Sequence, residues 1–110
     1  TRARSLGMTR TTFRNASGLP DPDQVTTARD MATLGRRLIE DFPQHYHYFG
    51  VTHAQFGAVR IRNHNGMLLD YDGADGIKTG FINASGFNIV TSAQRDGVRL
   101  VGAVFGGQSW

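Results

Sequence analysis

The chain has 110 residues and a formal net charge of +3 at pH 7; 39% of its residues are hydrophobic and 19% are charged. These values favour one small globular core over a disordered chain, and no run approaches the ~20 apolar residues of a membrane-spanning helix. The absence of cysteine excludes disulfides and thiolate chemistry. No signal-peptide pattern is visible at Thr1, so we expect any signal to precede this segment.

The amino-terminal part of the chain predicts little regular structure. Residues 1–5 predict the end of a helix, and residues 6–24 predict an irregular segment. This segment is interrupted by residues that favour turns, namely Gly7, Asn15, Gly18, Pro20 and Pro22.

One longer helix is predicted next. Thr27 and Asp30 fit a capping box, with Thr27 as the N-cap and Asp30 at the positive end of the helix. Pro43 ends the helix, and residues 44–49 predict another short helical turn. Apolar residues recur at helical spacing between these limits, and we expect them to be core: Met31, Leu34, Leu38, Ile39 and Phe42.

The second half of the chain has the pattern of strands. Residues 51–57 and 58–64 predict a hairpin that turns at Gly57-Ala58. Residues 87–95 and 98–105 predict two further strands, joined by Asp96-Gly97 in a type I′ turn.

The last predicted strand is apolar on both of its faces. Val98, Leu100 and Val104 share one face, whereas Val101, Ala103 and Phe105 share the other. Such a pattern indicates a sheet that is covered on both sides. Since one helix cannot cover both faces, the pattern predicts a further partner segment.

The segment from Asp75 to Phe81 contains the only lysine of the chain, Lys78, followed by Thr79 and Gly80; the other 11 basic residues are arginine. Lysine and arginine are not interchangeable where a compact ammonium or a transferable proton is needed. We expect this segment to be a strand that follows a loop containing Asp70, Asp72 and Gly73. A Lys-Thr-Gly tripeptide alone is weak evidence, so its surroundings decide its meaning.

Those surroundings resemble the catalytic domain of the low-molecular-weight penicillin-binding proteins, the serine-type D-alanyl-D-alanine carboxypeptidases. The matching segments are Asp75-Gly76-Ile77-Lys78-Thr79-Gly80, Ala84 to Ala93, Arg95-Asp96-Gly97, Arg99-Leu100-Val101, Leu6-Gly7-Met8-Thr9, Phe13-Arg14-Asn15, Gly18-Leu19, Thr27 to Ala32, Asn63-His64-Asn65 and Leu68-Leu69. The resemblance implies an α/β (α+β) fold of the penicillin-binding and serine β-lactamase type, with an antiparallel sheet packed by helices. It implies that residues 1–110 are the C-terminal part of a single catalytic domain, incomplete on its own.

Enzymes of this class combine Ser-x-x-Lys, a Ser-x-Asn-type motif and Lys-Thr-Gly. None of the five serines of the chain is followed by lysine at the third position or by asparagine at the second. These serines are Ser5, Ser17, Ser85, Ser92 and Ser109. In the family both missing motifs precede the matched region, so we expect this chain to be inactive alone. Its expected partner is the N-terminal part of the same domain as a second chain, or another copy of itself.

The resemblance also implies roles for particular residues. Lys78 would hold the substrate carboxylate and relay protons near the nucleophile, and Thr79 would hydrogen-bond that carboxylate. Gly80 would leave room for an extended acyl group, and the Phe81 backbone N–H would donate to the oxyanion. The implied substrates are D-Ala-D-Ala stem peptides of peptidoglycan and β-lactams. The implied location is the bacterial cell envelope, in the periplasm, and no cofactor or metal is implied.

Two positions differ from some members of the family. Phe81 stands where some members have histidine, and Gln108 follows Gly106-Gly107 where some have arginine. The backbone donor survives the first change, but a polar side-chain contact does not. We expect these changes to alter substrate affinity rather than reaction type.

Other site chemistry is less well supported by the sequence. The histidines His45, His47, His53 and His64 lack an accompanying cysteine or glutamate cluster, and the aspartates near Asp70 lack the spacing of a calcium loop. Asn15-Ala16-Ser17 and Asn83-Ala84-Ser85 match glycosylation sequons but are interpreted as turns.

Other functional classes remain as alternatives. The arginines could bind a nucleic acid, but they are scattered and lack a recognised motif, so a solvated basic surface is the better interpretation and no nucleic-acid partner is expected. A non-catalytic module that binds wall peptides through Lys78 and Thr79 is a second alternative. A class A β-lactamase relative is a third, although residues 6–19 and 27–42 favour the carboxypeptidases.

Overall fold

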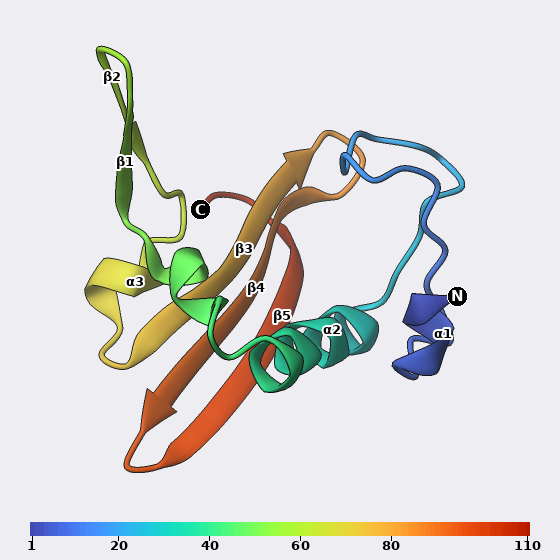
Figure 1. The fold of residues 1–110 in the computed structure, drawn as a ribbon. Coiled ribbons are helices and arrows are strands. Elements are labelled where there is room, and N and C mark those ends of the chain that lie inside the picture. Colours follow the sequence, from blue (N-terminus) through green and yellow to red (C-terminus); the bar gives the residue numbers. More distant parts are fainter.

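The computed structural model describes residues 1–110, and its centre is a three-stranded antiparallel sheet (Figure 1). The strands are β3 (Ala74–Ile82), β4 (Gly86–Arg95) and β5 (Val98–Gly107), in the spatial order β3-β4-β5. Asp96 and Gly97 join β4 to β5 with φ of 52° and 78°. Two successive positive φ values define the type I′ turn, so the predicted hairpin is confirmed.

Helix α2 (Ala28–Asp41) begins where the sequence predicts, but one half of the expected capping box is wrong. The Thr27 side chain accepts a hydrogen bond from the Asp30 amide at 3.1 Å, as an N-cap should. The Asp30 carboxylate does not return to the Thr27 amide. It accepts from the Arg10 amide at 2.9 Å and from the Thr11 hydroxyl at 2.7 Å. Asp30 therefore fastens the amino-terminal segment to α2.

The core lies between α2 and one face of the sheet. Ile77 and Val90 are buried there with Tyr46 of the 3₁₀ helix η1 (Tyr46–Gly50). A Cβ atom added to Gly35 would lie 3.0 Å from side-chain carbons of both Ile77 and Val90, so a glycine lets α2 approach the sheet closely. Around these three residues pack Met31, Leu38, Ile39, Phe49, Val101 and Ala103. Most of the predicted apolar stripe is therefore core, but Phe42 is exposed.

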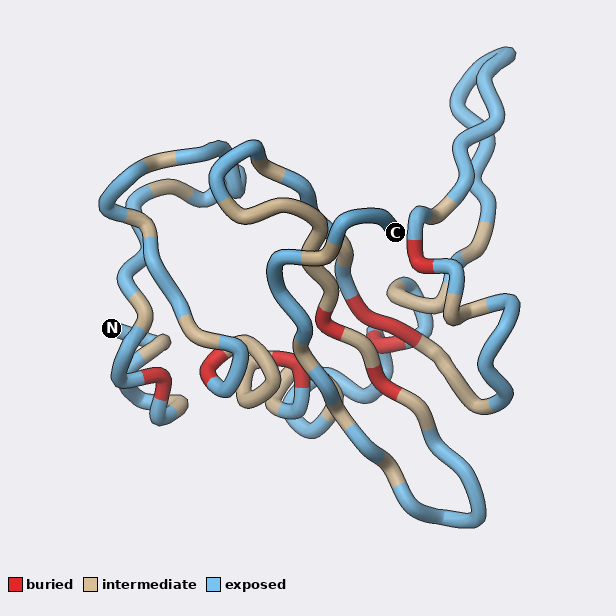
Figure 2. Tube along the Cα trace, turned by 180° about the vertical axis from the view of Figure 1, so that it is seen from behind, coloured by how far each residue is buried: buried red, intermediate tan, exposed pale blue.

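The two faces of β5 have different surroundings, although its apolar pattern predicts that both faces are covered. Val101 and Ala103 pack against the core below α2. Val98, Leu100 and Val104, which we call the outer face, are 62%, 72% and 60% exposed. Exposed and half-buried residues alternate along β5 from Val98 to Val104 (Figure 2). The chain covers one apolar face with its own helix and leaves the other open to solvent.

A separate hairpin projects from the body of the molecule (Figure 1). It consists of β1 (His53–Phe56) and β2 (Val59–Arg62), and it turns where predicted, although both strands are shorter than expected. Phe56 beside the turn is 80% exposed. The sequence missed the short helix α3 (Met67–Asp70), which lies between this hairpin and β3.

The amino-terminal segment is irregular after the short helix α1 (Arg2–Ser5), as predicted. A single antiparallel bridge joins Thr12 to Val25. Asn15 closes a turn by accepting a hydrogen bond from the Gly18 amide at 2.9 Å. None of the helices in this structure is both long and apolar enough to cross a membrane.

Candidate active site

Lys78, Thr79, Gly80 and Phe81 lie consecutively in β3, at the edge of the sheet. β3 pairs with β4 along one side only, so its other edge has no neighbouring strand. We call Lys78 to Phe81 the open stretch, because Lys78, Gly80 and Phe81 are exposed and Thr79 is half-buried. An unpaired edge of this kind can accept an extended peptide as an additional strand.

The cross-strand register gives the directions of the first two side chains. Lys78 lies opposite Val90 and Thr79 lies opposite Ile89, so these two side chains leave β3 on opposite faces. The Lys78 ammonium nevertheless donates a hydrogen bond to the carbonyl oxygen of Thr79. The cation is thereby held beside the backbone of the open stretch.

Gly80 provides free space at the edge. A Cβ atom added there would meet no atom within 4 Å. The Gly80 carbonyl accepts a long hydrogen bond of 3.3 Å from the Asn88 side chain, which also donates to Ser85 Oγ at 2.9 Å. An extended group could therefore lie against Gly80 without displacing a side chain.

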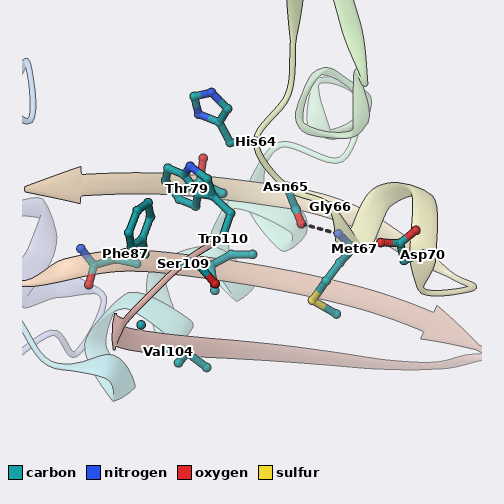
Figure 3. A pocket seen from close by; sticks show the side chains of 13 residues that line it. His64, Asn65, Gly66, Met67, Asp70, Thr79, Phe87, Val104, Ser109 and Trp110 are labelled. Atoms are coloured by element: carbon teal, nitrogen blue, oxygen red, sulfur yellow. Dashed lines mark hydrogen bonds between the residues drawn. The ribbon is translucent and has the colours of Figure 1, made fainter.

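An aromatic cluster lies on the face to which Thr79 belongs. The Phe81 and Phe87 rings are 4.6 Å apart between centroids, and Phe87 meets Trp110 edge to face at 4.8 Å. Trp110 also stacks on His64 at 5.1 Å. Figure 3 shows Phe87, Trp110 and His64 around a cavity of about 300 Å³, which Thr79 also lines.

A second cavity of about 760 Å³ adjoins the end of the open stretch. Gly80 and Phe81 form part of its wall, and the irregular segment contributes Phe13, Asn15 and Gln24. The segment that the sequence predicts to be irregular therefore forms one side of a groove next to the Lys-Thr-Gly strand.

The first residues of β3 are fixed by an ion pair. Asp75 Oδ1 accepts from Arg99 Nη1 at 2.8 Å, and Asp75 Oδ2 accepts from Arg99 Nη2 at 2.9 Å. Arg99 also donates to Ser92 Oγ at 2.8 Å and to Gln94 Oε1 at 3.0 Å. This bidentate geometry is among the stronger arrangements of a carboxylate and a guanidinium.

Tyr46 of η1 adds a third side chain to the Asp75–Arg99 ion pair. Its hydroxyl donates to Asp75 Oδ1 at 2.9 Å, and the Arg99 guanidinium lies 5.3 Å from its ring centroid. Burial, followed by the hydrogen bond to Asp75, raises the pKa of the Tyr46 hydroxyl to about 12. The pKa of Arg99 is also raised, chiefly by its hydrogen bonds to Asp75. We call Asp75, Arg99 and Tyr46 the β3 anchor.

Gly76 is enclosed immediately after the anchor. Its carbonyl accepts hydrogen bonds from Asn65 Nδ2 and from Thr91 Oγ1, both at 3.0 Å. A Cβ atom added at Gly76 would lie 2.6 Å from the Tyr46 hydroxyl oxygen. Only glycine fits at this position without displacing Tyr46.

The sequence interpretation missed the anchor. The arginines are interpreted above as a solvated basic surface, and this is wrong for Arg99, because its guanidinium pairs with Asp75 at 2.8 Å. One signal was available: Arg99 shares the inward face of its strand with Val101 and Ala103. A charge on an inward face requires a partner. The partner itself could not be identified because Asp75 lies 24 residues away in the sequence.

The other candidate chemistry receives no support from the geometry. No three histidine, aspartate or glutamate side chains gather closely enough to hold a metal ion. Two of the five serines lie near the Lys-Thr-Gly strand. Ser92 is buried and its hydroxyl oxygen accepts a hydrogen bond from Arg99, whereas Ser85 lies in the turn between β3 and β4.

The fold agrees with solved structures of penicillin-binding proteins. The chain superimposes on penicillin binding protein 5 from Haemophilus influenzae with a TM-score of 0.90 and 36% identity, covering 96% of this chain and 31% of that one. It superimposes on penicillin-binding protein D2 from Listeria monocytogenes in a cefotaxime-bound form with a TM-score of 0.86 and 29% identity, covering 98% of this chain and 45% of that one. The fold is thus of the penicillin-binding type, as the sequence resemblance implies.

The sequence comparisons identify the family. Residues 1–109 match the family described as D-alanyl-D-alanine carboxypeptidase. The chain is 40% identical to the D-alanyl-D-alanine carboxypeptidase DacC of Escherichia coli (strain K12) over 108 residues, which is 97% of this chain and 27% of that protein. It belongs to the D-alanyl-D-alanine carboxypeptidase family, and it spans about a quarter of the length of the curated relatives that it matches.

Proposed function

We propose that residues 1–110 are the C-terminal part of a single catalytic domain of a serine D,D-carboxypeptidase. This part supplies the Lys-Thr-Gly strand, whereas the Ser-x-x-Lys serine comes from residues outside the chain. The observation that supports this most directly is the open stretch. In a member of this family, the Lys-Thr-Gly residues lie on an unpaired strand edge, and no serine of the chain has the Ser-x-x-Lys spacing.

The proposed reaction removes the terminal D-Ala from a peptidoglycan stem peptide. The serine Oγ attacks the carbonyl carbon of the penultimate D-Ala and forms an acyl-enzyme, and the terminal D-Ala leaves with a proton on its nitrogen. Water then attacks the ester carbonyl, which releases the shortened peptide and returns the proton to the serine. A β-lactam carbonyl is attacked in the same way.

Each residue of the open stretch has a role in this proposal. Lys78 attracts the substrate carboxylate and relays protons, and Thr79 Oγ donates a hydrogen bond to that carboxylate. The Phe81 N–H stabilises the oxyanion, and loss of one such donor typically costs about 10²–10³ in rate. Gly80 leaves space for the acyl part of the stem peptide to lie extended along β3. The adjoining groove of about 760 Å³ offers a place for the next residues of the stem.

The outer face supports association with a further polypeptide. Val98, Leu100 and Val104 expose three apolar side chains on one face of β5, and we propose that the N-terminal part of the same domain covers them. Self-association through this face is the alternative. We further propose that the assembled protein acts in the periplasm of the bacterial cell envelope, as the family resemblance implies.

Release of D-alanine from a D-Ala-D-Ala peptide tests the proposal. The assay would compare this chain alone with the chain assembled with the polypeptide that carries the Ser-x-x-Lys motif. We expect no release from the chain alone, release from the assembly, and loss of release in Lys78→Ala. Release by the isolated chain would contradict the proposal. Saturable peptide binding by an assembly that releases nothing would replace it with a non-catalytic binding module.

A further inference from the structure

The β3 anchor coincides with an irregularity in the sheet. Ala74 lies opposite Ala93, whereas Gly76 lies opposite Ser92, so Asp75 is the additional residue of a bulge on β3. A β-bulge leaves its extra residue outside the regular pairing and redirects the strand that follows it. Here the extra residue holds the carboxylate that binds Arg99 and Tyr46.

The pairing of the open stretch depends on the position of this bulge. Beyond Gly76 the pairing is regular, with Lys78 opposite Val90 and Thr79 opposite Ile89. A slip of one residue would move every following side chain to the other face of the sheet. Lys78 and Thr79 would then exchange faces, and each side chain would lie on the side of the sheet that the other occupies in the structure.

We infer that Asp75, Arg99 and Tyr46 are positioning residues, which fix the bulge and thereby the register of Lys78, Thr79 and Phe81. This inference rests on the proposed function for its catalytic consequence, but not for its structural one. None of the three anchor residues needs to touch substrate. They act from one end of β3, where they join η1, β3 and β5 through the contacts described above. Asn65 and Thr91 support the same point of the strand by holding the Gly76 carbonyl.

A purely structural role would make a different prediction. An ion pair that only stabilises the fold would lower the melting temperature when broken and leave the open stretch unchanged. A pair that sets the register would alter the environment of Lys78 to Phe81 even where the protein remains folded. The two possibilities therefore separate in a measurement that reports on individual residues.

The experiment compares Asp75→Asn and Arg99→Lys with a matched control. Asp75→Asn keeps the shape of the side chain without its charge, and Arg99→Lys keeps the charge without the bidentate geometry. The control is Arg37→Lys, which weakens the Arg37–Asp41 pair of 3.1 Å on the surface of α2. Each variant is measured as the chain assembled with the polypeptide that carries the Ser-x-x-Lys motif. The readouts are the amide ¹H–¹⁵N signals of the open stretch and the rate constant of acylation by labelled penicillin.

We expect the amide signals of Thr79, Gly80 and Phe81 to shift in both anchor variants and to stay in place in the control. Acylation should fall by about 10- to 100-fold, the size of loss that a misplacement near 1 Å can cause. The double variant Asp75→Asn/Arg99→Lys should lose no more than the worse single variant, because the two residues act as one unit.

The inference is overturned if folded anchor variants keep these amide signals and acylate within about twofold of the unmodified protein. If Asp75→Asn or Arg99→Lys does not fold, Tyr46→Phe removes one hydroxyl from the anchor and is judged by the same amide signals. If the unmodified protein is not acylated at all, the proposed function fails. The amide signals then still decide between a register-setting and a purely stabilising anchor.

Discussion

The two halves of β3 differ in how far other side chains enclose them. At its beginning, Asp75 and Gly76 have their polar groups bound by side chains from η1, β4, β5 and the segment before α3. In the open stretch that follows, Lys78, Gly80 and Phe81 face solvent. Only Ile77 separates the enclosed half from the open one.

This difference shows how the proposed substrate-binding edge can be exposed without being loosely held. A strand edge that binds a peptide must keep its own partner groups free, so it cannot be stabilised by contacts at that edge. The chain places the stabilising contacts a few residues earlier, where the anchor and the Asn65 side chain hold the strand. Preorganisation of this kind lowers the cost of binding.

The largest expected effect is on Lys78, in the open half. Lys78→Ala should reduce penicillin acylation of the assembled protein by about 10²–10⁴-fold, because proton relay and attraction of the substrate carboxylate are both lost. Lys78→Arg should not restore the rate, since a planar guanidinium does not replace a compact ammonium. The free energy of unfolding, measured by urea titration, should change by less than about 0.5 kcal/mol, because this side chain is exposed. A rate within tenfold of the unmodified protein would contradict this role.

Alanine substitutions at two glycines of β3 should affect the free energy of unfolding differently in the enclosed half and in the open half. Gly76→Ala should lower the free energy of unfolding by about 1–3 kcal/mol, because the new methyl group overlaps the Tyr46 hydroxyl. Gly80→Ala, where nothing lies within 4 Å, should cost less than about 1 kcal/mol but weaken peptide or β-lactam binding. Equal losses of stability in the two variants would show that the halves do not differ as described.

Two arginines test whether the anchor is stronger than an ordinary surface pair. Arg99→Ala should destabilise by about 1–2 kcal/mol, since it leaves the half-buried Asp75 with one partner fewer. Arg37→Ala, which breaks the pair with Asp41 on α2, should cost no more than about 1 kcal/mol. Denaturant titration at low and high salt measures the loss of unfolding free energy in both variants. Only the loss caused by Arg37→Ala should become much smaller at high salt.

The smallest expected effect is the pH dependence contributed by Tyr46. Its pKa is about 12 in the fold against 10.0 for the free side chain. The folded state therefore favours the protonated hydroxyl. The resulting stability is fully present below pH 10 and is lost as the pH rises through 12. Because solvent reaches part of the network, the loss should be on the order of 1 kcal/mol. Unfolding measured at pH 9 and pH 11.5 should show this loss in the unmodified chain and a smaller one in Tyr46→Phe.

Most of the fold could be predicted from local patterns. The Thr27 cap, the helical stripe and the Asp96-Gly97 turn each depend on neighbouring residues, so the sequence shows them directly. The position of the Lys-Thr-Gly strand and the apolar character of both faces of β5 also follow from spacing and alternation.

The long-range contacts of the site could not be predicted. Tyr46 and Asp75 are 29 residues apart, and nothing near either one indicates the other. Asp30 illustrates the same limit: its local pattern predicts a capping box, but its carboxylate binds the backbone of Arg10 instead. Local rules identify which groups need a partner, whereas tertiary packing decides which partner they obtain.

Mapping the penicilloyl adduct tests the central claim most directly. The purified protein that contains this chain would be incubated with penicillin, digested, and analysed by mass spectrometry to locate the acylated serine. We expect the adduct on a serine of a Ser-x-x-Lys motif outside residues 1–110, and its loss in Lys78→Ala. An adduct on any serine within residues 1–110 would contradict the division of the active site between this chain and the rest of the domain.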